Sequence, residues 1–172
     1  MGHQQRPATV LVTGEETGGR FALVETIEQP GDELSYHRHH WEDEAIYVLD
    51  GALALSIAGT WVHAPIGTAV FVPRGVEHAY TITSERARLL TMLTPAGFER
   101  FYQEYDTVTA RSQMALPSLE QVVTLAARYG CEITGPHPGR PPAASAVGIV
   151  QATPSRDGSV ISREETHDSN NC

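Results

Sequence analysis

The feature that most constrains this fold is a series of short β-type segments over residues 8–93, with no helical pattern between them. Turn residues separate the segments, among them Pro30-Gly31, Asp50-Gly51 and Pro73-Arg74-Gly75. Asp-Gly between two apolar runs predicts a tight hairpin, and strands at such regular spacing predict an antiparallel sandwich or barrel. The sequence therefore predicts an all-β fold, with strands at 10–12, 21–27, 33–40, 45–49, 52–58, 61–63, 68–72, 78–83 and 88–93.

Helical patterns begin only after this β-rich part. Residues 98–105 carry aromatic side chains at helical spacing, and residues 117–129 carry an apolar stripe formed by Leu119, Val122, Val123, Leu125 and Ala126. Ser118 suits the N-cap of the second helix, and Gly130 suits its end. We expect both helices to lie against the outside of the barrel and to cover an apolar face or edge.

These patterns divide the chain into three parts. Residues 1–95 form the expected β-barrel core, and residues 96–135 form a helical extension packed on it. Residues 136–172 are rich in Pro, Gly, Ala and Ser before a polar end. This composition buries too little apolar surface to fold alone, so disorder is expected after about residue 140, with residues 147–150 as a candidate edge strand.

Charge and length exclude several classes of function. The 172 residues include 12 Lys and Arg against 21 Asp and Glu, a formal net charge of −9 that disfavours nucleic acid and anionic membranes as partners. No apolar run approaches the roughly 18 residues that span a bilayer, and residues 1–6 do not resemble a signal peptide. We therefore expect a cytoplasmic protein in which Cys131 and Cys172 are free thiols.

Three histidines and one acidic residue suggest a metal site. His37 and His39 are two apart on a predicted strand, so both side chains point to the same face. A hairpin after them would bring back Glu44, and the turn before His78 would aim its ring inward. Imidazoles with one carboxylate suit Ni, Co, Mn, Fe, Cu or Zn and suit Ca or Mg poorly.

The neighbours of these residues leave alternatives open. Each histidine of a lone His-x-His pair is more often a partly buried surface residue than a ligand. A one-residue bulge would turn Glu42 or Asp43 inward in place of Glu44, although Glu44 shares a strand face with Ile46 and Val48. His40 should face away from the site, on the surface or behind the ligands.

The spacing of these residues resembles the two motifs of the cupin superfamily. The first motif is matched by Gly31, His37, His39, Glu44 and Gly51, and the second by Gly67, Pro73, Gly75 and His78. The second motif ends in Asn, where this sequence has Ile82, a position that holds no ligand. The resemblance covers residues 30–85 and implies a jelly-roll barrel of six to eight strands with a metal inside one end.

Within that superfamily, the single cupin domain with His-x-His-x4-Glu and a helical extension resembles the bacterial quercetinase-like dioxygenases. The resemblance implies a quercetin 2,4-dioxygenase-like reaction, in which a divalent ion binds the deprotonated flavonol and O2 cleaves its heterocycle. His37, His39 and His78 would then be ligands, and Glu44 would be ligand and base. A small enolisable or anionic substrate also suits an interior lined by inward strand residues, expected to be Val48, Leu53, Leu55, Val70 and Val72, with Tyr80 near the rim.

Two other functions stay open. Single-domain cupins with nearly the same ligands include isomerases, cyclases and lyases that use no O2, and ligand-binding cupins without catalysis form a third class. No dinucleotide fingerprint, phosphate loop or nucleophile elbow is present, so the metal would carry the chemistry. A homodimer through the outer sheet, using Tyr36 and Trp41, is compatible with the sequence.

Overall fold

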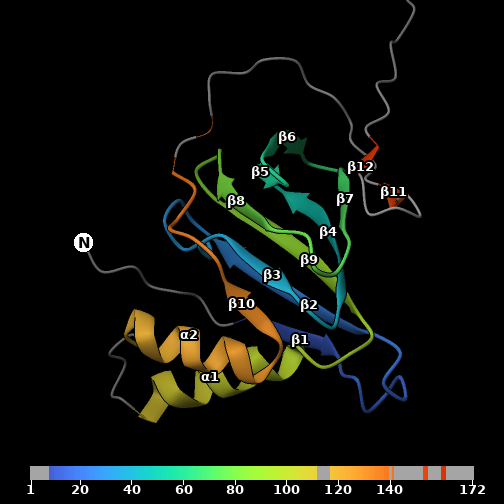
Figure 1. The fold of residues 1–172 in the computed structure, drawn as a ribbon, viewed down its shortest axis with the longest axis vertical. Coiled ribbons are helices and arrows are strands. Elements are labelled where there is room, and N and C mark those ends of the chain that lie inside the picture. Colours follow the sequence, from blue (N-terminus) through green and yellow to red (C-terminus); the bar gives the residue numbers. More distant parts are fainter. Residues whose placement is uncertain (1–7, 112–116, 140, 142–152, 155–159, 162–172) are drawn as a thin grey trace, which may run out of the picture.

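Two five-stranded antiparallel sheets face each other in the protein (Figure 1). The structure is a computed structural model that describes residues 8–111, 117–139, 141, 153–154 and 160–161. One sheet has the strand order β1-β2-β9-β4-β7 and consists of β1 (Thr9–Val12), β2 (Ala22–Glu28), β9 (Ala87–Thr94), β4 (Asp43–Asp50) and β7 (Ala69–Val72). The other has the order β10-β3-β8-β5-β6 and consists of β10 (Cys131–Ile133), β3 (His37–His39), β8 (His78–Ile82), β5 (Ala52–Ile57) and β6 (Thr60–Pro65).

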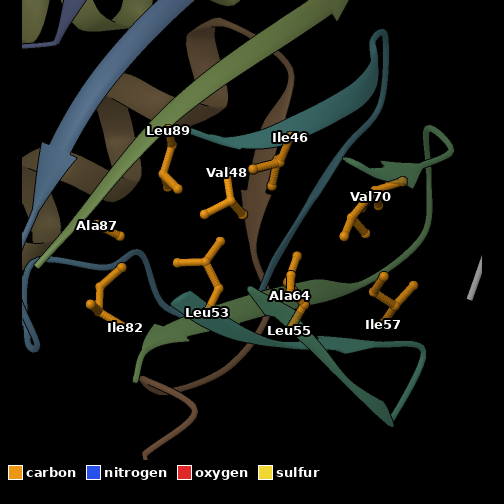
Figure 2. Close-up of a cluster of buried hydrophobic side chains, with 11 residues drawn as sticks. Ile46, Val48, Leu53, Leu55, Ile57, Ala64, Val70, Ile82, Ala87 and Leu89 are labelled. Atoms are coloured by element: carbon orange, nitrogen blue, oxygen red, sulfur yellow. The ribbon is translucent and has the colours of Figure 1, made fainter. Parts of the chain in front are cut away.

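Alternating side chains of the two sheets form the main core. Along β9, Ala87, Leu89, Thr91 and Leu93 are buried, whereas the residues between them are partly or fully exposed. The apolar side chains of both sheets point toward one another between the layers (Figure 2). This arrangement is the predicted all-β jelly roll. The five inward apolar residues expected from alternation, Val48, Leu53, Leu55, Val70 and Val72, are each at most 2% exposed.

The strand count differs from the expectation of six to eight. The edge strands β1 and β10 extend one end of each sheet, because β1 pairs with β2 and β10 pairs with β3. The sequence pattern missed β10, since three residues directly after a helix give no alternation to detect. The strand expected over 33–40 is confined to β3, which pairs with β8 on one side and β10 on the other.

Two helices follow the strands, α1 (Glu99–Arg111) and α2 (Leu119–Arg128). Ser118 caps α2 as predicted: its side chain accepts from the Gln121 backbone N–H, and the Gln121 side chain accepts in return from the backbone N–H of Ser118. The predicted apolar stripe of α2 is only partly buried. Leu119 is 70% exposed, and the buried side chains of the helix are Leu125 and Ala126.

The helices pack across one end of the two sheets rather than along their outer wall. Phe98 and Phe101 form one buried cluster with Val24 and Leu93, which are inward residues of β2 and β9. Leu125, Ala126 and Cys131 complete that cluster. The helices thus cover an apolar end of the barrel, because Phe98, directly before α1, and Phe101, within it, pack on inward residues of β2 and β9.

Some expectations concern residues outside the described ranges. These are the disorder after residue 140, the edge strand at 147–150 and the thiol of Cys172. Within the described ranges, Cys131 is buried and free, and β11 (Thr153–Pro154) pairs with β12 (Val160–Ile161). None of the helices in the described part of the chain is both long and apolar enough to cross a membrane.

Candidate metal centre

Two of the predicted ligands enter the site from the short strand β3. His37 and His39 are both 3% exposed, while Arg38 between them points outward, as strand alternation requires. His37 lies opposite His78 of β8 in the strand register, and their ring centroids are 4.2 Å apart. The His37 Nδ1 donates to the Ser35 carbonyl (2.8 Å), and the His78 Nδ1 donates to the Val76 carbonyl (3.0 Å). Both rings therefore direct Nε2 into the site.

Glu44 reaches the histidines from the opposite sheet. The sequence predicted a hairpin, but β3 and β4 belong to different sheets, so the chain crosses from one layer to the other between His39 and Asp43. The Glu44 Oε2 lies 2.9 Å from His78 Nε2 and 3.8 Å from His39 Nε2. One ligand atom from each of His37, His39, Glu44 and His78 lies within 4.8 Å of the others, so the structure brings all four together.

The protonation states of this cluster follow from burial and mutual contact. Burial lowers the pKa of His37 to about 3 and also lowers that of His39. Burial opposes ionisation of Glu44 and of His78, but their hydrogen bond outweighs it: the pKa of Glu44 falls to about 2, and that of His78 rises. The pair thus shares one proton between Glu44 Oε2 and His78 Nε2, as an ion pair without net charge in an apolar interior.

This donor set fits a divalent transition metal. Metal ligation requires neutral imidazole and ionised carboxylate, the states favoured here for His37, His39 and Glu44. Unpaired polar groups in an apolar interior cost free energy, and a cation between them offsets that cost. A mixed nitrogen and oxygen set suits the late first-row metals better than Ca or Mg. The cluster could therefore bind one such ion.

Neighbouring residues have other roles. His40 lies on the surface, as expected, with its Nε2 3.0 Å from Glu132. Asp43 points away from the site and bonds Arg74, whereas Glu42 is 2% exposed and lies behind His39. Burial raises the pKa of Glu42 to about 7. From the sequence, Glu42 is expected only as an alternative to Glu44. Its position two residues before Glu44 indicates that both side chains point to the same side of the chain.

A second, partly buried polar pair bridges the two sheets. The Tyr80 hydroxyl donates to both carboxylate oxygens of Glu28, at 2.9 and 2.8 Å. Tyr80 lies two residues beyond His78 on β8 and packs against the main core, so its ring faces the interior, as expected. Burial raises the pKa of Glu28 to about 7. Sequence analysis missed Glu28, since one acidic residue at a strand end gives no distinctive signal.

Comparisons with known proteins agree with this geometry. The family model described as "Cupin domain" matches residues 24–93. The chain is 33% identical over 95 residues to the quercetin 2,3-dioxygenase of Bacillus subtilis (strain 168), covering 55% of this chain and 28% of that protein. It is 31% identical over 78 residues to a tetracenomycin polyketide synthase protein of Streptomyces glaucescens, covering 44% and 52%. A solved structure of the polyketide cyclase RemF from Streptomyces resistomycificus is 29% identical, with a TM-score of 0.44, covering 54% and 68%.

The matched stretch coincides with the site. Residues 24–93 contain all four converging side chains and the strands that carry them. The chain spans less than a third of the quercetin dioxygenase and about half of the polyketide synthase protein. Over residues 24–93 the chain is therefore similar to a cupin domain, and this stretch carries the whole convergent ligand set.

Proposed function

We propose that this chain is a metal-dependent cupin dioxygenase that acts on a small enolisable aromatic such as a flavonol. The observation that carries the proposal is the convergence of three imidazoles and one carboxylate inside an apolar interior. The substrate class is supported by the 33% identity to a quercetin 2,3-dioxygenase over 95 residues, a stretch that includes more than half of this chain.

His37, His39, His78 and Glu44 would hold the ion. Bound there, a divalent metal supplies Lewis acidity and a positive charge that favours an anionic oxygen of the substrate beside O2. The apolar side chains around the site exclude water, which strengthens the attraction between that oxygen and the positive charge. Val72 of β7 lies opposite Glu44 of β4 in the strand register, and Val48 lies two residues beyond Ile46 on β4. Both valines are at most 1% exposed.

Glu44 is the candidate base. Its carboxylate stays ionised across the neutral range, because the pKa is lowered to about 2 by the His78 bond and the neighbouring imidazoles against the effect of burial. Because it is ionised, Glu44 can accept a hydrogen bond from a substrate hydroxyl within reach of one of its oxygens. The lowered pKa makes Glu44 a weak base, so transfer of that proton would depend on a bound metal that acidifies the hydroxyl. Glu44→Gln removes this acceptor charge while keeping the side-chain volume.

A second candidate is a cupin of the isomerase, cyclase or lyase type that uses no O2. The observation in its favour is the 31% identity to a tetracenomycin polyketide synthase protein. The same four side chains would serve it, since polarising an enolisable carbonyl needs the metal and a base but no oxidant. Binding without catalysis is less favoured, because four convergent polar groups serve no structural need in an apolar barrel.

The test compares quercetin consumption under air and under argon. The protein is loaded in turn with Ni, Co, Mn, Fe, Cu and Zn, and loss of flavonol absorbance is followed together with O2 uptake. The proposal expects loss under air with stoichiometric O2 uptake and none under argon. Equal turnover under argon would favour the non-oxidative candidate, and binding without turnover would favour a binding protein.

Site variants test the ligands separately from the reaction. His37→Ala combined with His39→Ala should abolish metal loading, measured as metal per chain. His40→Ala is the matched control, because His40 adjoins the ligands in sequence but lies on the surface beside Glu132. Stoichiometric loading of the double variant would show that the ligand assignment is wrong.

A further inference from the structure

Two buried polar atoms beside the metal centre face each other without a bond. The Nδ1 of His39 and the Oε2 of Glu42 are 3.9 Å apart. Their side chains are 3% and 2% exposed, and neither atom has a hydrogen-bond partner among the residues that the structure describes. Unpartnered buried polar atoms are rare and call for an explanation, because leaving each one unpaired costs about 1–3 kcal/mol.

His39 differs in this respect from the other two histidines of the site. The Nδ1 atoms of His37 and His78 donate to backbone carbonyls, at 2.8 and 3.0 Å. Those carbonyls fix the rings with Nε2 toward the site. In His39 the corresponding nitrogen faces a side-chain carboxylate, while Nε2 faces Glu44 at 3.8 Å. When ionised, a carboxylate accepts such a hydrogen bond more strongly than a carbonyl does.

The surroundings of Glu42 leave its carboxylate available for this contact. The nearby buried Glu99 is occupied, since its oxygens accept from the backbone N–H groups of Gly14 (3.1 Å) and Gly97 (2.6 Å). Gly97 also leaves space for Glu42, because a Cβ there would lie 3.0 Å from the Glu42 Oε1. The Arg74 guanidinium, whose charge favours the ionised form of Glu42, forms its hydrogen bonds with Asp43 instead.

We propose that Glu42 is a positioning residue that accepts the Nδ1–H of His39 and so holds this ring as a metal ligand. The inference rests on the metal site of the proposed function. Closing the gap from 3.9 Å to an ordinary N–H···O distance needs a movement of about 1 Å. The bond would fix the tautomer that presents Nε2 to the ion and would place a negative charge behind the ligand, which raises its basicity.

This role predicts a loss of metal affinity in Glu42 variants. Removing a carboxylate behind a ligating histidine typically weakens metal binding by about 10- to 100-fold. We expect a loss in that range for Glu42→Leu, and a smaller loss for Glu42→Gln, which keeps an acceptor oxygen but not the charge. Glu99→Gln is the matched control: it removes a buried carboxylate from the same region, but one that bonds only backbone N–H groups.

The experiment measures Co2+ affinity by competition with a chelator on the full chain. In parallel, proton NMR of the Co2+-loaded protein observes the paramagnetically shifted, exchangeable Nδ1–H signals of the three histidines. We expect Glu42→Gln to move one of the three signals and to weaken Co2+ binding, while Glu99→Gln leaves both unchanged. A purely structural role of Glu42 would lower the thermal stability of the metal-free protein without selecting one histidine signal.

Each outcome separates this inference from the proposed metal site. Unchanged affinity and unchanged signals in Glu42→Gln, with normal binding by the wild type, would overturn the role of Glu42 alone. Equal losses in Glu42→Gln and Glu99→Gln would do the same. Failure of the wild-type protein to take up Co2+ would overturn the metal site, and the role of Glu42 with it. If Glu42→Leu does not fold, the isosteric Gln variant carries the test.

Discussion

The partly buried carboxyl of Glu28 should make the protein less stable as the pH rises. Glu28 ends β2, and within the described part of the chain it accepts hydrogen bonds from neutral hydroxyls, chiefly that of Tyr80 at 2.9 and 2.8 Å. Burial raises the pKa of Glu28 from its ordinary value near 4.5 to about 7, and the neighbouring acidic residues Glu33 and Asp32 add to the rise. The protonated form is therefore favoured in the folded protein.

The sign and size follow from proton linkage. Between pH 4.5 and about 7 the unfolded chain has lost the Glu28 proton while the folded protein retains it, so the free energy of unfolding falls as pH rises. Above about pH 7 both states are ionised, and the full loss persists. Each pKa unit corresponds to about 1.4 kcal/mol, which gives an upper bound of about 3 kcal/mol. Partial exposure of Glu28 adds solvent screening, so we expect about 1–3 kcal/mol.

Glu28→Gln tests this reasoning because it keeps an acceptor for Tyr80 but cannot ionise. Urea unfolding of the metal-free protein should give equal stability for variant and wild type near pH 4.5, and a variant more stable by about 1–3 kcal/mol near pH 8. Glu85→Gln, at an exposed position, is the matched control and should show no such divergence. A stability difference that stays constant between the two pH values, or a wild type favoured near pH 8, would refute the argument.

Three further changes test the packing around the site. Tyr80→Phe removes the hydroxyl that donates to Glu28. In urea unfolding it should lower the free energy of unfolding by about 1–3 kcal/mol near pH 8 and by less near pH 4.5. A larger loss at the lower pH would contradict this prediction. Phe98→Ala deletes a ring that is 1% exposed and should cost about 3–5 kcal/mol in the same assay, with Phe98→Leu as the milder control; a loss below 1 kcal/mol would show that the helices do not depend on this ring. Gly51→Ala places a Cβ against the Arg86 carbonyl at a φ of +80° and should lower the melting temperature, whereas an unchanged value would argue against that turn geometry.

Local rules in the sequence predict most of the barrel and the common strand face of two of the four converging side chains. Period-two alternation placed His37 and His39 on one face and identified the inward apolar residues of the strands. The Asp50-Gly51 turn joins β4 to β5 with a positive φ at Gly51, so the turn itself is confirmed. These features depend on neighbours a few residues apart, so one sequence suffices to find them. The predicted hairpin is wrong, because β4 and β5 belong to different sheets and the turn carries the chain from one layer to the other.

Long-range choices were beyond such rules. Alternation fixes the face of a strand but not the sheet that it joins, so it missed that β3 and β4 lie in opposite layers. Likewise, an apolar stripe shows that a helix packs on something, but not on what or over how much of its length. Phe98 packs edge-on against His39, with ring centroids 4.4 Å apart, which links α1 to the metal centre. No local pattern encodes that contact.

Three consecutive acidic residues, Glu42, Asp43 and Glu44, lie in three different environments. Glu42 and Glu44 point inward, behind and beside the histidines, while Asp43 between them points outward and bonds Arg74. The Asp43–Arg74 pair ties β4 to the turn before His78, but with side chains 25% and 49% exposed it should contribute only about 0–1 kcal/mol. Ile46 and Val48, at most 1% exposed, continue the inward face of β4 and contribute far more. The position of Glu44 therefore depends mainly on apolar packing further along its strand, and a core substitution there should disturb the metal centre more than loss of the surface ion pair.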